Sequence, residues 1–300
     1  MSRVSLVMGS MGRSQEPLEF VESLARQSVP PRELIIVDQN EDDRLEPVEV
    51  RAKLLGITVK RIKEQQKNLS HARNIGIAQA VGDIIGFPDD DCWYEPDVIE
   101  QVEASFEADP TLHAITGSWS EAPPQNNVAG LIDIKELLNF RGPRTSSILL
   151  FVRCEALKAL RGFDPRLGTG QWFGAAEEID LVMRLGLSGK KLHYAPEITI
   201  HHPYNSVSNK PMKGNRLNTR LRSRGTGALY AKLSLKSYVV LRGCIAPVIR
   251  CILPPYRWEE KLALLNQAQG RIEGLFAWQH KYGCGKCSWD SHADAQIFEK

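Results

Sequence analysis

The chain has 300 residues, of which 42% are hydrophobic and 25% charged, and its net charge at pH 7 is +2. This composition is ordinary for a globular protein and excludes a disordered, collagen-like or repetitive chain. Six irregularly spaced cysteines do not suggest a secreted disulfide framework, the first residues lack signal-peptide features, and no stretch is apolar enough to span a bilayer. We therefore expect a cytoplasmic protein with reduced thiols.

The first hundred residues alternate between strand and helix signals. Apolar runs predict strands at 4–8, 34–37, 58–62 and 83–87, and helical spacing predicts helices at 17–27, 70–80 and 96–106. Ser70 is the expected N-cap of the second helix and Pro96 the expected first residue of the third. This alternation predicts an α/β fold, with a mostly parallel sheet flanked by helices.

The later part of the chain gives weaker signals. We expect a loop at 123–127, a helix at 131–138, a strand at 146–152, a helix at 177–187 and a strand at 198–202. Apolar spacing then predicts helices from about residue 215 to 280, interrupted at Pro254 and Pro255. The expected division is a first domain of residues 1–210 and a mostly helical, basic appendage of residues 211–300.

Acidic side chains fall at the ends of two predicted strands. Asp38 closes the run ELIIVD (33–38), and Asp89, Asp90 and Asp91 follow the run DIIGF and Pro88. Ligands bind at the carboxyl ends of the strands in such sheets. Three adjacent carboxylates repel one another, and Mg²⁺ or Mn²⁺ would cancel that repulsion through oxygen ligands. A solvated Asp-rich turn is the alternative, and it would be the better interpretation of an isolated triplet.

These motifs and their order resemble the family 2 glycosyltransferases, which have the GT-A fold. The resemblance covers about residues 4–202 and includes the opening strand and loop at 4–13, ELIIVD at 33–38, ARNIG at 72–76 and the aspartate triplet. It implies an inverting, metal-dependent enzyme that moves a sugar from a nucleoside-diphosphate-sugar to an acceptor hydroxyl, in cell-surface polysaccharide or glycan assembly. Residues 1–210 would then be the nucleotide-sugar-binding and catalytic domain.

The resemblance also implies roles for individual residues. Asp38 would bind the nucleoside base, and Arg73 would lie near the donor. Asp89 would contact the ribose of the donor or the metal, and Asp91 would bind the metal on the diphosphate. The full set expected at the donor is Met8, Ser10, Arg13, Asp38, Arg73, Asp89 and Asp90. Taken singly, Asp38 could instead cap a turn and Arg73 could be a surface cation.

A second acidic segment, GTGQWFGAAEEID (168–180), precedes the predicted helix at 177–187. It resembles the GEDxDLxxR motif that carries the catalytic base of the family, with Glu178 in place of the usual Asp. Glu177, Asp180 and Arg184 share a helix face, whereas Glu178 points about 100° away. Glu178 is therefore the expected base, with Glu177 and Asp180 as reserves, because an acceptor hydroxyl needs a base within hydrogen-bond reach.

Aromatic and imidazole side chains complete the predicted site. Trp172 and Phe173 could stack on an acceptor sugar or pack in the core. Many GT-A enzymes have a metal-binding His after the last strand, and the spacing from Tyr194-Ala195-Pro196 favours His202 over His201. Neighbouring strand residues point to opposite faces, so only one of the two should reach a metal.

The C-terminal region is strongly basic. Residues 198–258 contain eleven lysines and arginines and no Asp or Glu. Such a segment could lie at an anionic surface on the inner face of a membrane and serve a lipid-linked acceptor, or it could be a solvated appendage. No nucleic-acid-binding module accompanies the charge, so no nucleic acid partner is expected. A zinc site at His280, Cys284, Cys287 and His292 has only weak support, since a single CxxC is present.

Two other functions fit parts of the pattern. A sugar-phosphate nucleotidyltransferase would need a glycine-rich, basic phosphate loop after the first strand, and residues 9–13 (GSMGR) are a poor version of one. A non-catalytic, membrane-associated nucleotide-binding protein could also use a degenerate fold of this kind.

Overall fold

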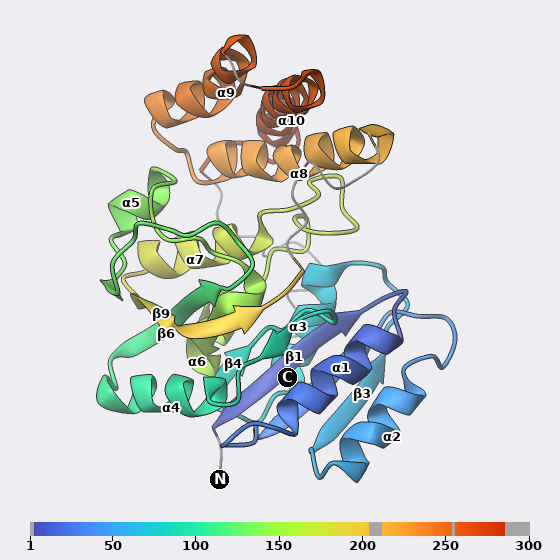
Figure 1. The fold of residues 1–300 in the computed structure, drawn as a ribbon. Coiled ribbons are helices and arrows are strands. Elements are labelled where there is room, and N and C mark those ends of the chain that lie inside the picture. The colour runs from blue at the N-terminus through green and yellow to red at the C-terminus, as the bar shows by residue number, and fades with distance from the viewer. Residues whose placement is uncertain (1–2, 204–211, 254–255, 286–300) are drawn as a thin grey trace.

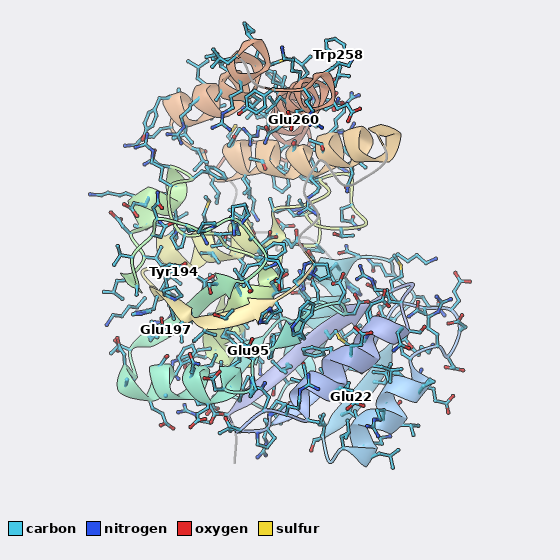
Figure 2. The ribbon with its side chains drawn as sticks, viewed as in Figure 1. Glu22, Glu95, Tyr194, Glu197, Trp258 and Glu260 are labelled. Atoms are coloured by element: carbon cyan, nitrogen blue, oxygen red, sulfur yellow. The ribbon has the colours of Figure 1, made fainter. Side chains whose placement is uncertain are left out.

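The computed structural model describes residues 3–203, 212–253 and 256–285 (Figure 1). A nine-stranded sheet has the order β3-β2-β1-β4-β8-β6-β9-β5, with β7 added on β9. The predicted α/β fold with a helical C-terminal region is confirmed. Figure 2 shows that the helical region and the first helix are at opposite ends of the molecule, marked by Trp258 and Glu22.

The N-terminal half of the sheet is parallel. Its strands are β1 (Val4–Ser10), β2 (Glu33–Asp38), β3 (Val59–Lys63) and β4 (Ile84–Gly86), with β1 between β2 and β4. β1 and β2 are buried on both faces, which is why they read as continuous apolar runs. The carboxyl ends of β1 and β2 therefore meet, with Ser10 opposite Asp38.

The other half is mixed, so the parallel pairing predicted for most of the sheet holds only in part. β8 (Leu150–Arg153) is antiparallel to both β4 and β6 (Leu112–Trp119), and β6 is parallel to β9 (Lys191–His201). β5 (Trp93–Tyr94) and β7 (Gly130–Leu131) are antiparallel to β9. The sequence did not predict β5, β6 or β7, and β9 begins well before the predicted residue 198.

Helices cover both faces of the sheet. One core, with Leu6 and Met8 of β1, includes residues of α1 (Gln15–Leu24), α2 (Glu46–Leu54) and α4 (Val98–Ala108). The other, with Val7, includes residues of α3 (Leu69–Gln79), α6 (Cys154–Ala159) and α7 (Glu177–Leu187). Neighbouring residues of one strand enter different cores because side chains alternate across a strand. The short elements α5 (Ile134–Leu138) and the 3₁₀ turn Ser147–Leu149 complete this part.

Both helix starts that were predicted from a particular residue, Ser70 and Pro96, are wrong. The N-cap of α3 is Asn68, whose side chain accepts a hydrogen bond from the main-chain N–H of His71, while Ser70 lies inside the helix and donates to the carbonyl of Leu167. α4 begins at Val98, two residues after Pro96. Helix α2 was not predicted. α7 has the predicted bounds.

The C-terminal region consists of α8 (Met212–Lys232), α9 (Ser237–Ile252) and α10 (Trp258–Tyr282). Glycines allow very close packing here: a Cβ at Gly274 of α10 would lie 2.0 Å from the carbonyl oxygen of Arg224 in α8. A Cβ at Gly225 would lie 1.9 Å from the carbonyl oxygen of Ala175, so α8 rests directly on the segment that leads into α7. Among the described residues, no helix has the length and apolar character needed to cross a membrane.

Candidate active site

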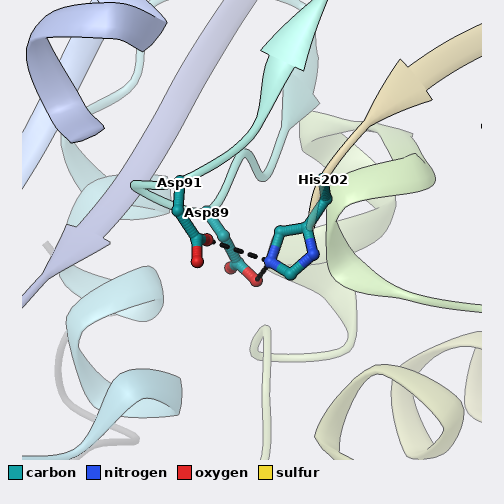
Figure 3. A group of neighbouring side chains, drawn as sticks. All are labelled: Asp89, Asp91 and His202. Carbon is teal, nitrogen blue, oxygen red and sulfur yellow. Dashed lines mark ion pairs between the residues drawn. The ribbon is translucent and has the colours of Figure 1, made fainter. Parts of the chain in front are cut away.

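The loop after β4 brings Asp89 and Asp91 to the imidazole of His202 (Figure 3). Nε2 of His202 lies 2.9 Å from Oδ1 of Asp91 and 3.9 Å from Oδ2 of Asp89. One ligand atom from each of the three residues lies within 4.8 Å of the others. His202 follows the last residue of β9, one residue beyond the observed end of a strand that was predicted to include it. Trp119 of β6 supports His202 by donating its Nε1–H to the carbonyl of His202 at 2.7 Å.

Arginines hold the second oxygen of each of these aspartates. Arg13 contacts Oδ2 of Asp91 at 2.7 Å, and Arg73 donates to Oδ1 of Asp89 at 2.9 Å. Each carboxylate therefore gives one oxygen to a guanidinium and turns the other toward His202. The middle residue, Asp90, is bound instead by Arg13 and by the hydroxyl of Ser10 at 2.6 Å.

Burial and these contacts shift the pKa values of the cluster in different directions. Burial raises the pKa of Asp90, and the contacts with Ser10 and Arg13 offset this only partly. Burial also opposes ionisation of Asp91, but His202 and Arg13 outweigh it and hold the pKa of Asp91 below its ordinary value. Burial alone would lower the pKa of His202, but the carboxylate of Asp91 outweighs it and raises that pKa above its ordinary value. Asp91 and His202 thus stabilise one another as an ion pair.

Arg73 joins this cluster to the second acidic segment. It is fully buried, and besides Asp89 it contacts Oε1 of Glu177 at 3.2 Å and Oγ of Ser147 at 2.7 Å. Its guanidinium carbon also lies 5.3 Å from the centre of the Phe163 ring. The two acidic segments predicted from the sequence therefore lie on either side of one arginine.

The three carboxylates in the first turn of α7 have different surroundings. Glu177 is paired with Arg73, and Asp180 is fully buried between Arg184 at 2.7 Å and Lys232 at 2.6 Å. Glu178 has no ion pair within 4 Å in the described part of the chain. Burial raises its pKa to about 8, reinforced by the charge of Glu177 and opposed by Arg222. Of the three, Glu178 is best suited to accept a proton near neutral pH.

The backbone at the start of α7 is unusual. Ala176 is the N-cap, and its φ of 80° lies in the left-handed region that residues with a Cβ seldom adopt. Such conformations persist where the surroundings enforce them. Here the contact of Gly225 with Ala175 fixes the preceding residue, and this positions the first turn of α7.

His201 points away from the cluster, as expected from alternation along a strand. Its two ring nitrogens lie 2.7 Å from Oε1 of Glu121 and 2.6 Å from Oε1 of Glu95, and its ring stacks on Trp93. Glu121 also accepts a hydrogen bond from the main-chain N–H of His202 at 3.1 Å. Sequence reasoning missed Glu95, Trp119 and Glu121, which fix the end of β9, because the strand that contains Trp119 was not recognised.

Asp38 and Met8 are both fully buried. The carboxylate of Asp38 accepts hydrogen bonds from Asn40 and pairs with Lys63 at 3.0 Å and Arg61 at 3.2 Å. Met8 packs in the core, so only its main chain is left for a ligand. Beside Asp38 is a cavity of about 800 Å³, lined by Gln39, Asn40, Glu41, Asp43, Lys63, Glu64, Gln65 and Lys67.

The two predicted acceptor aromatics differ in exposure. Phe173 is buried against Trp278, with ring centres 5.2 Å apart, so it belongs to a core formed with the C-terminal helices. Trp172 is 48% exposed, and the guanidinium of Arg224 lies over its ring at 4.3 Å. Of the possible zinc ligands, Cys287 and His292 lie outside the described residues.

The donor set at Asp89, Asp91 and His202 fits a divalent cation. Carboxylate oxygens suit Mg²⁺ and Mn²⁺, and an imidazole nitrogen is a common ligand of the transition metals. The residues that hold the other oxygens, Arg13 and Arg73, keep both carboxylates oriented without occupying the oxygens that face His202.

The nine-stranded mixed sheet with acidic residues at its strand ends is the fold of the GT-A glycosyltransferases. Over 92% of this chain it is similar to the mannosyltransferase PcManGT from Pyrobaculum calidifontis in complex with GDP-Man and Mn²⁺, with a TM-score of 0.57, 17% identity and 72% of that chain covered. Over 90% it is similar to S. aureus TarS 1–349 in complex with UDP-GlcNAc, with a TM-score of 0.58, 13% identity and 91% of that chain covered.

The sequence matches Glycosyl transferase family 2 over residues 5–161, just over half of the chain, and the protein belongs to this family. It is 29% identical over 120 residues to a glucosyl-dolichyl phosphate glucuronosyltransferase of Haloferax volcanii, covering 39% of this chain and 38% of the relative. It is 32% identical over 114 residues to the uncharacterized glycosyltransferase YwdF of Bacillus subtilis, covering 37% of this chain and 41% of the relative. The matched segments thus span about two fifths of these relatives.

Proposed function

We propose that this protein is a metal-dependent, inverting glycosyltransferase that moves a sugar from a nucleoside-diphosphate-sugar to an acceptor hydroxyl. The observation that carries the proposal is the bridge made by Arg73, which contacts Asp89 in one acidic segment and Glu177 in the other. The bridge lies between the three residues that could hold a cation, Asp89, Asp91 and His202, and the first turn of α7, where the pKa of Glu178 is raised.

Asp89, Asp91 and His202 would hold a Mg²⁺ or Mn²⁺ ion, which would supply positive charge next to the leaving diphosphate. Arg13 and Ser10 both bind Asp90, the middle residue of this loop. The nucleoside would lie in the cavity beside Asp38. Because Asp38 is enclosed, its part would be to position Lys63 and Asn40 at the wall of that cavity.

Glu178 would act as the general base. A group with a pKa of about 8 is a stronger proton acceptor than an ordinary carboxylate, and part of its population is ionised at neutral pH. It would take the proton of the acceptor hydroxyl while the oxygen attacks the anomeric carbon from the side opposite the diphosphate. A single displacement of this kind inverts the configuration at that carbon and leaves no covalent sugar on the enzyme.

The acceptor would approach past Trp172, whose exposed ring offers an apolar face to a sugar. The acceptor would be a glycan or a lipid-linked saccharide in cell-surface assembly. A lipid-linked acceptor is favoured by the basic C-terminal region and by the similarity to the glucosyl-dolichyl phosphate glucuronosyltransferase of Haloferax volcanii. It would place the protein in the cytoplasm, peripherally at the inner face of the membrane.

The first experiment is a thermal unfolding screen with UDP, GDP and dTDP, each with and without Mn²⁺. A ligand that binds only the folded state raises its stability, by roughly 2.7 kcal/mol at a hundred times its Kd. We expect one nucleotide to stabilise the protein in a Mn²⁺-dependent manner. The Asp91→Asn variant should lose this effect, whereas Asp83→Asn, at an exposed carboxylate paired with Arg3 before the start of β4, should keep it. Metal-independent stabilisation by every nucleotide would contradict the proposal.

The reaction itself is tested with the sugar donor of the nucleotide identified in that screen. Release of nucleoside diphosphate that depends on an added acceptor, and a product of inverted anomeric configuration by NMR, are the expected results. Retention of configuration would contradict the single displacement, and release of pyrophosphate from a nucleoside triphosphate would indicate a nucleotidyltransferase instead.

A further inference from the structure

Helix α9 exposes an apolar face to solvent. Six of its hydrophobic side chains are between 40% and 77% exposed: Tyr238, Leu241, Ile245, Val248, Ile249 and Ile252. They recur at spacings of three and four residues, so they form one stripe along the helix. A helix on the surface of a globular protein normally turns its polar residues outward. The outward face of α9 is the reverse of that arrangement.

A second face of α9, which adjoins the stripe at Arg242, lines a cationic cavity. Arg242, Gly243, Ala246, Pro247 and Arg250 border a cavity of about 380 Å³ between α8, α9, α10 and the loop at 140–141. Arg141 and Arg271 add two more guanidinium groups, and no carboxylate is among the lining residues.

The arginines of this cavity have few partners. Arg271 donates to the carbonyl of Gly243 at 2.6 Å, and its buried Nε makes no hydrogen bond within the described chain. Arg242 donates to the carbonyl of Asn139. In the described ranges none of the four arginines is within 4 Å of a carboxylate. Like charges brought together in a partly enclosed space repel one another, and an anion in the cavity would remove that repulsion.

The surroundings of α9 match a membrane surface. Tyr238 at one end of the helix and Tyr256 and Trp258 after the other are exposed, and aromatic residues of this kind favour the headgroup region of bilayers. α9 lies at the end of the molecule that is distant from the sheet (Figure 1), and Trp258 is at the same end (Figure 2). Sixteen residues that include two arginines suit a helix lying in the interface plane.

We propose that α9 docks on an anionic membrane, with its apolar stripe among the acyl chains and a phosphate headgroup of a lipid in the arginine cavity. The charge of the cavity selects the phosphate, and the adjoining apolar stripe selects a lipid as its source over a free phosphate. A protein partner would have to supply both an apolar groove and several acidic groups. This proposal does not depend on the transferase reaction, since membrane binding is measured without turnover.

The test is flotation of the full chain with vesicles of phosphatidylcholine, with and without 30 mol% of phosphatidylglycerol as the anionic lipid. We expect binding to the anionic vesicles, weakened by salt because exposed charges are screened. The double variant Ile249→Ser/Ile252→Ser should bind at least tenfold less. Its matched control is Val50→Ser/Leu54→Ser, at two exposed apolar residues of α2 at the far end of the molecule, which should bind as the wild type does.

The cavity is tested separately with Arg141→Gln/Arg250→Gln. Each cation near an anionic surface strengthens binding roughly fivefold, so this variant should lose most of the preference for anionic over neutral vesicles. Arg26→Gln, at an exposed arginine far from α9, is the control. Far-UV circular dichroism and the unfolding midpoint should be unchanged in all four variants.

Three results would overturn the proposal. Equal binding to neutral and anionic vesicles would show that the cavity does not bind an anionic headgroup. Stabilisation by inorganic phosphate without vesicle binding would assign the cavity to a soluble anion. A dimer in solution that Ile249→Ser/Ile252→Ser converts to a monomer, again without vesicle binding, would show that a second copy of the chain covers the stripe.

Discussion

Replacing Lys232 by Met tests how the helical region is attached to the catalytic part. Lys232 of α8 is fully buried, and its Nζ lies 2.6 Å from both Oδ2 of Asp164 and Oδ1 of Asp180. Removing one partner of a buried ion pair costs about 3–5 kcal/mol because the other charge stays buried. Asp164 also has Arg166 at 2.6 Å, and Asp180 has Arg184 at 2.7 Å. Both carboxylates therefore keep one cation in Lys232→Met. We expect the free energy of unfolding to fall by about 3 kcal/mol, the lower end of that range.

Urea unfolding at pH 7 measures this loss. The control is Arg220→Gln, which removes an ion pair between α8 and Glu273 of α10; it should leave the free energy of unfolding close to that of the wild type, because Glu273 keeps Arg224 as a partner. If Lys232→Met unfolds within 1 kcal/mol of the wild type, the buried network is not what fixes α8 to α7, and the argument from burial is refuted.

The pH dependence gives a second check on the same network. Burial opposes ionisation of Asp164, but Lys232 and Arg166 outweigh it and hold its pKa well below the ordinary value. A depressed carboxyl pKa contributes stability that is present above the unfolded-state pKa, about 4, and is lost as the pH falls toward the folded-state value. The difference between wild type and Lys232→Met should therefore shrink below about pH 4. A constant difference from pH 7 to pH 3 would contradict this.

Four further predictions concern the site and use three variants. Glu178→Gln should lower kcat by about 10²–10⁴-fold, which is the usual contribution of a general base. The kcat of the wild type should rise as the pH approaches 8, because Glu178 then loses its proton. A Glu178→Gln variant with unchanged kcat would exclude Glu178 as the base. A raised carboxyl pKa lowers the stability of the folded protein as the pH rises from about 4.5 to 8. Glu178→Gln should therefore gain stability relative to the wild type over that range, as measured by unfolding at several pH values. The same pH dependence of stability in both proteins would contradict the raised pKa. Arg73→Lys keeps the charge but loses the fork that spans Asp89 and Glu177, so kcat should fall, and wild-type kcat would contradict the bridge. Ala176→Gly should raise the free energy of unfolding by about 0.5–1 kcal/mol because glycine adopts a positive φ without strain, and a loss of stability would contradict the left-handed conformation.

Much of the N-terminal half could be predicted because its signals are local. β1 and β2 are buried on both faces and therefore appear as uninterrupted apolar runs, and Asp89 to Asp91 stand directly after such a strand. The helix Glu177–Leu187 was predicted with its observed bounds, since its apolar spacing is regular.

The missed elements depend on contacts between distant parts of the chain. β6 is buried because β8 and β9 lie on either side of it, and its register with β9 shifts twice, so its sequence has no regular alternation. The N-cap at Asn68 is fixed partly by a hydrogen bond from its side chain to the carbonyl of Pro165, which no local pattern reveals.

The same reason limits prediction of the site. The motif ARNIG drew attention to Arg73, but its contact with Glu177 joins residues 104 positions apart. The sequence placed Asp180 and Arg184 on one helix face, and the two form an i,i+4 ion pair, whereas the burial of Lys232 beside Asp180 was not foreseen. Spacing along one helix is readable from sequence, but a partner on another helix is not.

The most direct measurement of the central claim is a crystal structure with Mn²⁺ and the stabilising nucleoside diphosphate, using the anomalous signal of manganese. The account predicts one manganese peak within about 2.0–2.3 Å of ligand atoms of Asp89, Asp91 and His202, shared with diphosphate oxygens. A nucleotide bound in this fold without manganese between these three residues, or with manganese bound elsewhere, would contradict the account.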